Sequence, residues 1–275
     1  MRDPEDCDFP SALEIGGKVK IVVCLKRVPD VAEAEVKVRP DGSGIIDDRL
    51  VFDINEPDNY ALEEALLIKE RVGGEVVLVS LGDEKVEEVL RMGLAKGADD
   101  AVRITDPRFS GLDGPATGMV LARAIERLGY DLILTGCMAT DDGQAVVGPV
   151  IARILDIPYA TLVTKIELGD GRARISRELE GGLLEVSEVK LPALFAIQTG
   201  INEPRYASML GIKRASKREI RVMGGSDLGI TEISSRSEIL RFFIPPVTKH
   251  AEIIEGPPDE TAAKLAQLIK EKGVL

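Results

Sequence analysis

The sequence predicts an α/β protein: an open, mostly parallel sheet flanked by helices, with an appended β meander and an extended carboxyl-terminal arm. Short runs rich in Val, Ile and Leu alternate with segments of about 12 residues whose apolar positions repeat at helical spacing. Right-handed strand–helix–strand crossovers of this kind build parallel sheets. After Ala160, apolar and polar residues alternate with a period of two between glycine-containing turns, which is typical of antiparallel strands.

The elements of the parallel part follow one another in regular order. The expected strands are Val19–Leu25, Glu75–Leu81, Asp100–Ile104 and Asp131–Thr135. The expected helices are 56–71 with Asn55 as its N-cap, Glu84–Ala95, Gly114–Leu128 and Gln144–Leu155. Val36–Arg39 and Ile45–Asp47 flank Pro40-Asp41-Gly42-Ser43-Gly44 and predict a hairpin.

The remaining chain divides into a meander and a tail. The expected antiparallel strands are Thr161–Glu167, Arg172–Arg177, Leu183–Val189 and Ala193–Ile197. We therefore expect a flexible extension over residues 1–18, one α/β domain over 19–230 and an arm over 231–275. The arm is polar and Pro-containing and ends in an amphipathic helix, Asp259–Lys272. Because it cannot bury much surface by itself, it is expected to dock on another chain.

Composition excludes several classes of function. The formal net charge is −12, so a phosphate backbone would repel the protein and nucleic-acid binding is not expected. The three cysteines show no paired spacing, and the single histidine, His250, disfavours histidine catalysis and histidine metal sites. No apolar run is long enough for a membrane span, and Met1–Gly17 has none of the features of a signal peptide. A cytoplasmic protein is expected, held at a membrane only if partner subunits are.

The strongest local motif is the loop Gly136–Pro149, between an expected strand and helix. Ligands of open α/β sheets bind at the carboxyl ends of the strands, and free N–H groups at a helix start attract phosphate. Asp141 and Asp142 suit ribose hydroxyls or a helix cap better than phosphate. A capped loop without any ligand is the competing interpretation.

Two other segments have both a structural and a functional interpretation. Asn55-Glu56-Pro57-Asp58 resembles a helix start and could also lie against an adenine ring beside the first strand. Asp113 and Thr117 could cap a helix or help bind phosphate there. Lys26-Arg27 follows the first strand, where no GxGxxG fingerprint occurs, so a standard NAD site is not predicted. These two cations are either solvated or directed at phosphate or a partner.

The chain resembles the beta subunit of electron-transfer flavoproteins, also called the FixA type. The motifs that carry the resemblance follow in order from Val19 to Ile230: KIVVCLKRVPD, Asn55-Glu-Pro, LAKGAD (94–99), the Gly136–Pro149 loop, RELEGG (177–182), LPA (191–193) and NEPRY (202–206). The resemblance implies an adenine-nucleotide-binding fold that forms a heterodimer with an FAD-bearing alpha subunit.

Carried over by position, the family pattern implies two groups of nucleotide contacts. The adenosine would lie against Cys24, Asn55, Glu56, Pro57, Asp58, Ser80 and Leu81. The phosphates would lie against Gly136, Thr140, Asp141, Asp142, Gly143, Gln144, Ala145, Val146 and Val147.

The resemblance also implies partner contacts. The basic segment 205–217 is similar to a recognition segment for dehydrogenases, with Arg205, Lys213 and Arg214 around an apolar anchor at Met209 or Leu210. An apolar plug ringed by cations suits transient docking on an acidic surface. Glu178 is by itself a surface charge, and the family pattern implies that it holds the mobile FAD domain of the alpha subunit. Residues after Thr231 would embrace that subunit.

The family contains two kinds of beta subunit. One binds AMP structurally and serves a carrier reduced by dehydrogenases. The other binds a second FAD, takes hydride from NADH and bifurcates the electrons between a high-potential acceptor, such as a quinone-reducing partner, and ferredoxin or flavodoxin. Val147-Gly148-Pro149, Asp113 and Thr117 are similar to the bifurcating kind, so FAD is expected and AMP is the alternative. A stand-alone adenine-nucleotide-binding protein is the third hypothesis.

Overall fold

The computed structural model describes residues 18–31, 36–246, 251 and 253–274. The extension predicted for residues 1–18 lies outside the described residues except for Lys18. The chain forms two compact units. The larger contains the described residues of 1–36 and 46–240, and the smaller those of 37–45 and 241–275.

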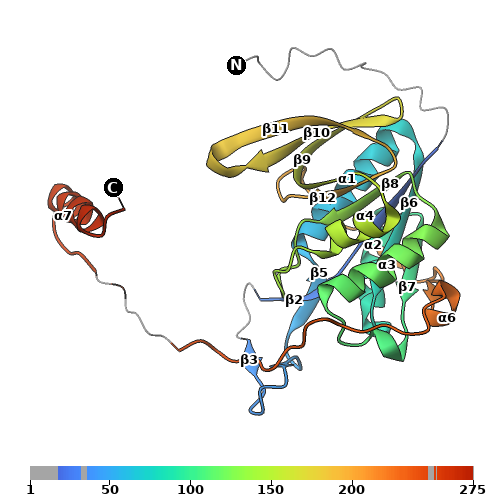
Figure 1. The fold of residues 1–275 in the computed structure, drawn as a ribbon, viewed down its shortest axis with the longest axis horizontal. Coiled ribbons are helices and arrows are strands. Elements are labelled where there is room, and N and C mark those ends of the chain that lie inside the picture. Colours follow the sequence, from blue (N-terminus) through green and yellow to red (C-terminus); the bar gives the residue numbers. More distant parts are fainter. Residues whose placement is uncertain (1–17, 32–35, 247–250, 252, 275) are drawn as a thin grey trace. The chain divides into compact units, whose positions relative to one another are not determined.

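A nine-stranded sheet forms the centre of the larger unit (Figure 1). In spatial order its strands are β11 (Leu183–Lys190), β10 (Arg172–Leu179), β9 (Tyr159–Gly169), β12 (Ala193–Ile197), β8 (Leu132–Gly136), β1 (Val19–Cys24), β6 (Gly74–Leu81), β7 (Asp100–Ile104) and β13 (Arg221–Met223). Neighbours from β9 to β13 pair in parallel, and β9, β10 and β11 pair antiparallel. The predicted α/β class is therefore confirmed.

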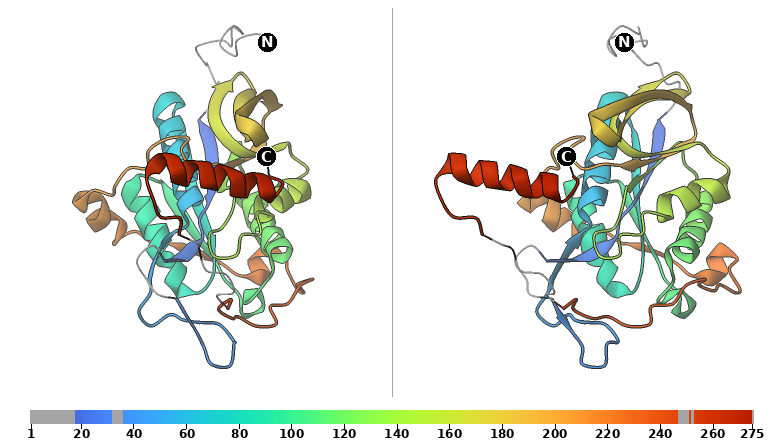
Figure 2. Two further views of the ribbon diagram at one scale, coloured as in Figure 1. Left: turned by 90° about the vertical axis from the view of Figure 1, so that its left-hand side faces the viewer. Right: turned by 60° about the vertical axis from the view of Figure 1, so that its left-hand side comes forward.

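Helices cover both faces of this sheet, as Figure 2 shows from two sides. Alternate residues of β1 explain why both faces are buried: Ile21 and Val23 face one hydrophobic cluster, and Val22 and Cys24 face the other. The first cluster packs against α1 (Glu56–Val72), α2 (Glu87–Lys96) and α5 (Met209–Ala215). The second packs against α3 (Gly114–Leu128), α4 (Val147–Leu155) and α6 (Gly225–Leu228).

Smaller elements join the main ones. Three short 3₁₀ helices occur among the described residues: η1 (Glu84–Val86), η2 (Pro107–Phe109) and η3 (Glu180–Gly182). The strands β2 (Arg27–Asp30) and β5 (Val51–Ile54) pair antiparallel and lead the chain into α1. The predicted hairpin is confirmed as β3 (Lys37–Val38) paired with β4 (Ile45–Ile46). In the smaller unit, the backbone N–H of Phe242 donates to the carbonyl of Gly42 at 2.8 Å, and α7 (Pro258–Glu271) is the last helix of the described residues.

Two expectations about elements are wrong. Ala193–Ile197 is not an antiparallel meander strand, because it inserts between β8 and β9 and pairs in parallel with both. All five of its residues are buried, as in a strand covered on both faces, and this burial distinguishes it from the alternating strands before it. The helix expected from Gln144 begins at Val147, because the preceding residues remain in the loop.

Within the described part of the chain, no helix has both the length and the apolar character needed to cross a membrane.

Candidate functional site

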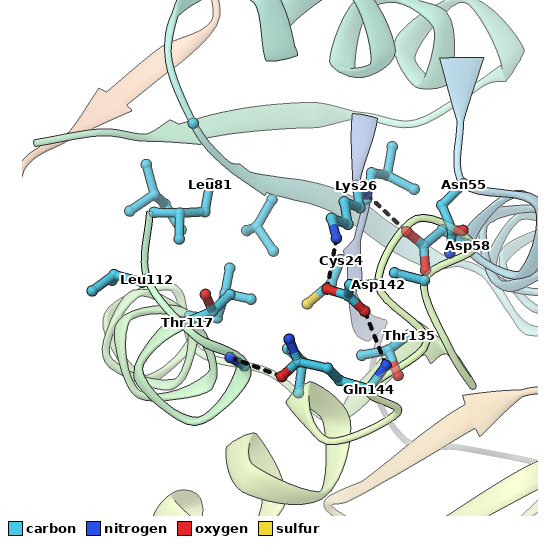
Figure 3. Close-up of a pocket in the computed structure, with 18 of the residues that line it drawn as sticks. Cys24, Lys26, Asn55, Asp58, Leu81, Leu112, Thr117, Thr135, Asp142 and Gln144 are labelled. Atoms are coloured by element: carbon cyan, nitrogen blue, oxygen red, sulfur yellow. Dashed lines mark hydrogen bonds and ion pairs between the residues drawn. The ribbon is translucent and has the colours of Figure 1, made fainter. Parts of the chain in front are cut away.

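A cavity of about 640 Å³ opens at the carboxyl ends of four adjacent parallel strands, β8, β1, β6 and β7 (Figure 3). Its lining includes Thr135, Cys24, Leu81 and Ile104, one residue from each strand. Neighbouring strands lie about 4.8 Å apart, so four strands span roughly 14 Å. The cavity therefore has the position and length of an extended ligand site in an open α/β sheet.

The side chain of Asn55 is hydrogen-bonded to the backbone of the Gly136–Pro149 loop. Its Nδ2 donates to the carbonyl of Met138 at 2.9 Å, and its Oδ1 accepts from the backbone N–H of Thr140 at 3.0 Å. Asn55 is the N-cap residue of α1, as predicted, but its side chain makes no capping hydrogen bond to the helix. The buried amide of Asn55 hydrogen-bonds to the loop because the carbonyl of Met138 and the N–H of Thr140 would otherwise be unpaired there.

Asp58 ties the same loop to the end of β1. One carboxylate oxygen accepts from the backbone N–H of Lys26 and the other from that of Gly136, both at 2.8 Å. Burial raises the pKa of Asp58 to about 6 and outweighs these hydrogen bonds, which favour the charged form. Any Cβ on Gly136 would lie 2.4 Å from Asp58 Oδ1, so glycine is required for this approach.

Lys26 lines the cavity, and its ammonium group pairs with two aspartates of the Gly136–Pro149 loop. Its Nζ lies 2.5 Å from Asp141 Oδ1 and 2.9 Å from Asp142 Oδ2. Burial lowers the pKa of Lys26, but the hydrogen bonds to these two aspartates outweigh burial and leave it raised. The positive charge of Lys26 is therefore more than offset by the two carboxylates.

Gln144 continues this chain of contacts to α3. Its backbone N–H donates to Asp142 Oδ1 at 3.0 Å, and its side-chain Oε1 accepts from the backbone N–H of Gly114 at 3.2 Å. Figure 3 shows the resulting links from Lys26 through Asp142 and Gln144 to the start of α3. The next residue, Ala145, has a φ of 54°, in the left-handed region that a residue with a Cβ seldom adopts.

Thr135 supplies an unused polar group beside the start of α4. Its Oγ1 is buried and has no hydrogen-bond partner among the described residues. Gly148, in the first turn of α4, lies so close that a Cβ there would be 3.0 Å from this oxygen. The helix begins at Val147 without a side-chain cap from the described residues. A hydroxyl and free N–H groups thus meet here, as in anion sites.

The far wall of the cavity is a segment that no sequence motif indicated. It runs from Thr105 to Leu112 and includes η2, and its Phe109 and Leu112 lie near Leu121 of α3 in the lining. This segment has neither periodic spacing nor a glycine fingerprint. Asp106 before Pro107 was the available local signal, since it caps η2 through the backbone N–H of Arg108.

The predicted cofactor residues divide into two groups. Those that line the cavity are Cys24, Asn55, Asp58, Leu81, Thr117, Gly136, Asp142, Gln144, Ala145, Val146 and Val147. Those outside its lining are Glu56, Pro57, Ser80, Asp113, Thr140, Asp141 and Gly143. Ser80 lies outside because residues of a strand alternate between faces, and its neighbours Val79 and Leu81 occupy the cavity face. Lining residues that the sequence did not single out include Thr135, Phe109 and Leu112.

Asp113 has a different environment from the one expected. Its Oδ1 caps α3 through the N–H of Ala116, as predicted, at 2.9 Å. Its Oδ2 accepts from the backbone N–H groups of Arg236 and Ser237 at 2.7 and 3.0 Å. These contacts, led by Ala116, lower the pKa of Asp113.

The residues of the predicted recognition segment differ in their surroundings: some are exposed to solvent and one is paired with α1. Met209 and Leu210 are exposed over 82% and 56% of their surface, and Lys213 and Arg214 are exposed beside them. Arg205 instead points at α1, where its guanidinium pairs with Glu63 at 2.8 Å and Glu70 at 2.6 Å.

Glu178 lies elsewhere, on β10. It is exposed and accepts a hydrogen bond from Gln198 Nε2 at 3.4 Å. The structure thus leaves this carboxylate on the surface, as the sequence suggested.

Comparison with known proteins gives consistent results. A family model for the electron transfer flavoprotein domain matches residues 43–228, which include every cavity-lining segment except the one at the end of β1. The electron transfer flavoprotein subunit beta of Methylophilus methylotrophus is 39% identical over 262 residues, covering 92% of this chain and 98% of that protein.

Two further relatives carry more specific names. The caffeyl-CoA reductase-Etf complex subunit CarD of Acetobacterium woodii is 37% identical over 265 residues, 94% of this chain and 100% of that protein. Protein FixA of Azotobacter vinelandii is 34% identical over 268 residues, 91% of this chain and 94% of that protein. The similarity extends over nearly the whole of each chain.

Proposed function

Because this chain belongs to the electron-transfer flavoprotein family as a beta subunit, we propose that it binds FAD in the cavity and serves in NADH oxidation with electron bifurcation. The acceptors would be a high-potential partner and ferredoxin or flavodoxin. The observation that carries the proposal is the extent of the cavity, from Asn55 and Asp58 to the apolar wall at Phe109 and Leu112.

The residues present fit a dinucleotide cofactor. Thr135 offers an unpaired buried hydroxyl, and the glycines at 136 and 148 leave room for the side chains of Asp58 and Thr135 against the backbone there. The volume of about 640 Å³ lies within the range of roughly 300–1,000 Å³ that is common for ligand pockets. When bound, FAD would supply both hydride chemistry and single-electron chemistry.

The protein's own residues would bind and orient that group. Asn55 and Asp58 fix the loop that faces the adenosine end, and Thr135 with the first turn of α4 would hold phosphate oxygens. Phe109, Leu112 and Leu121 would exclude water from the other end, where the flavin ring would lie. No side chain is assigned as acid or base, because hydride transfer requires none.

One observation favours the alternative, a structural AMP. Gln144 Oε1 accepts from the N–H of Gly114, so the start of α3 is engaged and the apolar end is partly separated from the loop. A nucleoside monophosphate would fill the Asn55 end alone. FAD would require the Gln144 side chain to turn away from Gly114.

Beta subunits of this family pair with an alpha subunit, and we propose two contact regions. Exposed Ile239 and Leu240 belong to residues 231–275, which would form an arm on that subunit. Exposed Met209 and Leu210, flanked by Lys213 and Arg214, would dock on an acidic partner protein such as a dehydrogenase.

The test is nucleotide analysis of the purified heterodimer. We expect two FAD per heterodimer and bleaching of flavin absorbance by NADH under anaerobic conditions. One FAD with one AMP, and no reduction by NADH, would replace the proposal by its alternative.

A variant locates the flavin end of the cavity. Thr117→Leu adds bulk beside the apolar wall, so it should reduce FAD content while AMP binding remains. Met119→Leu is the matched control, since Met119 is exposed on the same helix. Equal loss of both nucleotides in Thr117→Leu would contradict the placement.

A further inference from the structure

The apolar wall of the cavity, residues 105–112, is hydrogen-bonded near both of its ends to the part of the chain that follows α5. At one end, Asp106 Oδ2 accepts from the N–H of Gly225 at 3.1 Å, and Arg108 Nη1 donates to the carbonyls of Ile230 and Thr231 at 2.9 and 2.7 Å. Asp106 and Arg108 also pair with each other at 2.7 Å. The start of the wall is therefore hydrogen-bonded to residues 225–231.

Asp113 forms the second set of hydrogen bonds to the tail, at the point where the wall meets α3. Its backbone N–H donates to Ser235 Oγ at 2.9 Å, and its Oδ2 accepts from the N–H groups of Arg236 and Ser237 and from Ser237 Oγ at 3.2 Å. One carboxylate oxygen is thus devoted to the tail while the other caps α3. Asp113 is 8% exposed and does not line the cavity.

The tail also packs beneath this wall. Leu228 and Ile230 belong to the same buried cluster as Phe109 and Leu121, and Ile233 packs against it. Phe109 and Leu121 line the cavity as well. A shift of the wall toward or away from a ligand therefore disturbs both the hydrogen bonds and the packing of residues 225–237.

We propose that Asp113 is a positioning residue that couples the nucleotide cavity to the segment 233–240, and that it does not contact the nucleotide itself. The inference rests on the proposed function. A nucleotide that orders the wall orders the tail through Asp113, and a partner that orders the tail prepares the wall. Such coupling is reciprocal, because both ligands act on one equilibrium.

Asp113→Asn separates the two roles of the side chain. The Asn Oδ1 still caps Ala116, whereas the amide NH₂ cannot accept from Arg236 or Ser237. Ser237→Ala removes only the hydroxyl bond and should have a smaller effect. Asp131→Asn is the matched control: Asp131 accepts a hydrogen bond from the N–H of Lys20, at the amino ends of β1 and β8, and does not line the cavity.

The readout is amide hydrogen exchange of the heterodimer, stripped of beta-subunit nucleotide and then titrated with FAD or AMP. In the wild type, the nucleotide that binds should slow exchange of residues 233–240 by about fivefold or more, a common size for coupling between sites. Asp113→Asn should abolish this response, weaken nucleotide binding by a similar factor and leave exchange of residues 116–120 unchanged. Asp131→Asn should keep the full response.

Three results would overturn the inference. Nucleotide may bind to the wild type without changing exchange over 233–240, which would refute the coupling alone. Asp113→Asn could weaken nucleotide binding yet keep the full tail response, which would make Asp113 a direct ligand. If neither FAD nor AMP binds to the wild type, the proposed function and this inference both fail.

Discussion

Asp58 and Gly136 come from α1 and the end of β8, and the carboxylate of Asp58 accepts a hydrogen bond from the backbone N–H of Gly136 at 2.8 Å. The same carboxylate accepts from the N–H of Lys26 after β1. A single buried side chain thus joins a helix start to the ends of two adjacent strands. The geometry of the cavity at this end depends on that junction.

Replacement of Gly136 by alanine should disrupt the junction. The added Cβ would lie 2.4 Å from Asp58 Oδ1 and 2.8 Å from Asp58 N, closer than real contacts allow. We expect a loss of about 1–3 kcal/mol in the free energy of unfolding, as for overpacking generally, and a loss of bound nucleotide. Chemical denaturation and nucleotide analysis measure both. Gly44→Ala, where the nearest atom would be 3.9 Å away, should be close to neutral. Unchanged nucleotide content in Gly136→Ala would contradict the expectation.

Asp58 should make stability depend on pH. Its pKa is about 6 in the folded protein against an ordinary value of 3.8, so the folded state keeps a proton that the unfolded chain releases. The contribution of Asp58 to the free energy of unfolding is therefore fully present below about pH 4 and is lost as the pH rises to about 6. The loss is on the order of 3 kcal/mol. Urea midpoints of wild type and Asp58→Asn between pH 4 and 7 measure the difference. The variant should be less stable, since its NH₂ faces a backbone N–H, and should lack this part of the slope. Parallel curves would contradict the shifted pKa.

Asn55 should matter for the loop and not for the helix that it precedes. Asn55→Ala removes the bonds to Met138 and Thr140, so amide exchange over 138–142 should accelerate and stability should fall by about 1–3 kcal/mol. Exchange over 58–61, in the first turn of α1, should be unchanged because the Asn55 side chain makes no hydrogen bond to it. Faster exchange confined to the first turn would show instead that the Asn55 side chain caps the helix.

Arg205 should contribute to stability more than to docking. Its guanidinium pairs with Glu63, which is 4% exposed, so Arg205→Ala would leave a buried carboxylate without its cationic partner and with the backbone N–H of residue 205 as its remaining contact from this residue. We expect a loss of about 2 kcal/mol, moderated by the partial exposure of Arg205 itself. Lys213→Ala, on the exposed side of α5, should leave the thermal midpoint unchanged. Equal midpoints for both variants would contradict the difference in roles.

Met209, in contrast to Arg205, should contribute to docking more than to stability. Its side chain is 82% exposed, so Met209→Ala should leave stability within about 0.5 kcal/mol of the wild type. Electron transfer with the physiological partner should show a raised KM, because an exposed apolar anchor would be lost. Phe109→Leu, deep in the cavity wall, provides the contrasting variant with an effect on stability. An unchanged KM in Met209→Ala would remove this residue from the docking surface.

Local sequence signals were sufficient for several elements. Gly114–Leu128 is a helix with the predicted bounds, since Asp113, Pro115 and Gly129 mark its ends and its apolar spacing is regular. The burial of β1 also follows from its composition. The orientation of Ala193–Ile197 did not follow, because an apolar run of five residues fits a parallel or an antiparallel neighbour equally well, and only insertion between β8 and β9 decides.

The candidate site was predictable to a similar degree. The glycine-containing loop after a strand indicated Gly136, because ligands bind at the carboxyl ends of parallel strands, and Asp58 was indicated by the helix start Asn55-Glu56-Pro57-Asp58 and by the family resemblance. The wall from Thr105 to Leu112 was missed, since its residues become neighbours of the cavity only after β7 is placed beside β6 in the sheet.

The sequence by itself determined the α/β class, the location of the main loop and, through its ordered motifs, the family. The tertiary structure alone decided the partners of the charged and amide side chains. Asp58 joins two strand ends, Asn55 holds the loop, Arg205 pairs with α1 and Asp113 binds the tail. Local spacing sets helices and strands through short-range sterics and hydrogen bonds. A buried polar group, in contrast, takes whatever partner the fold brings to it, often more than a hundred residues away along the chain.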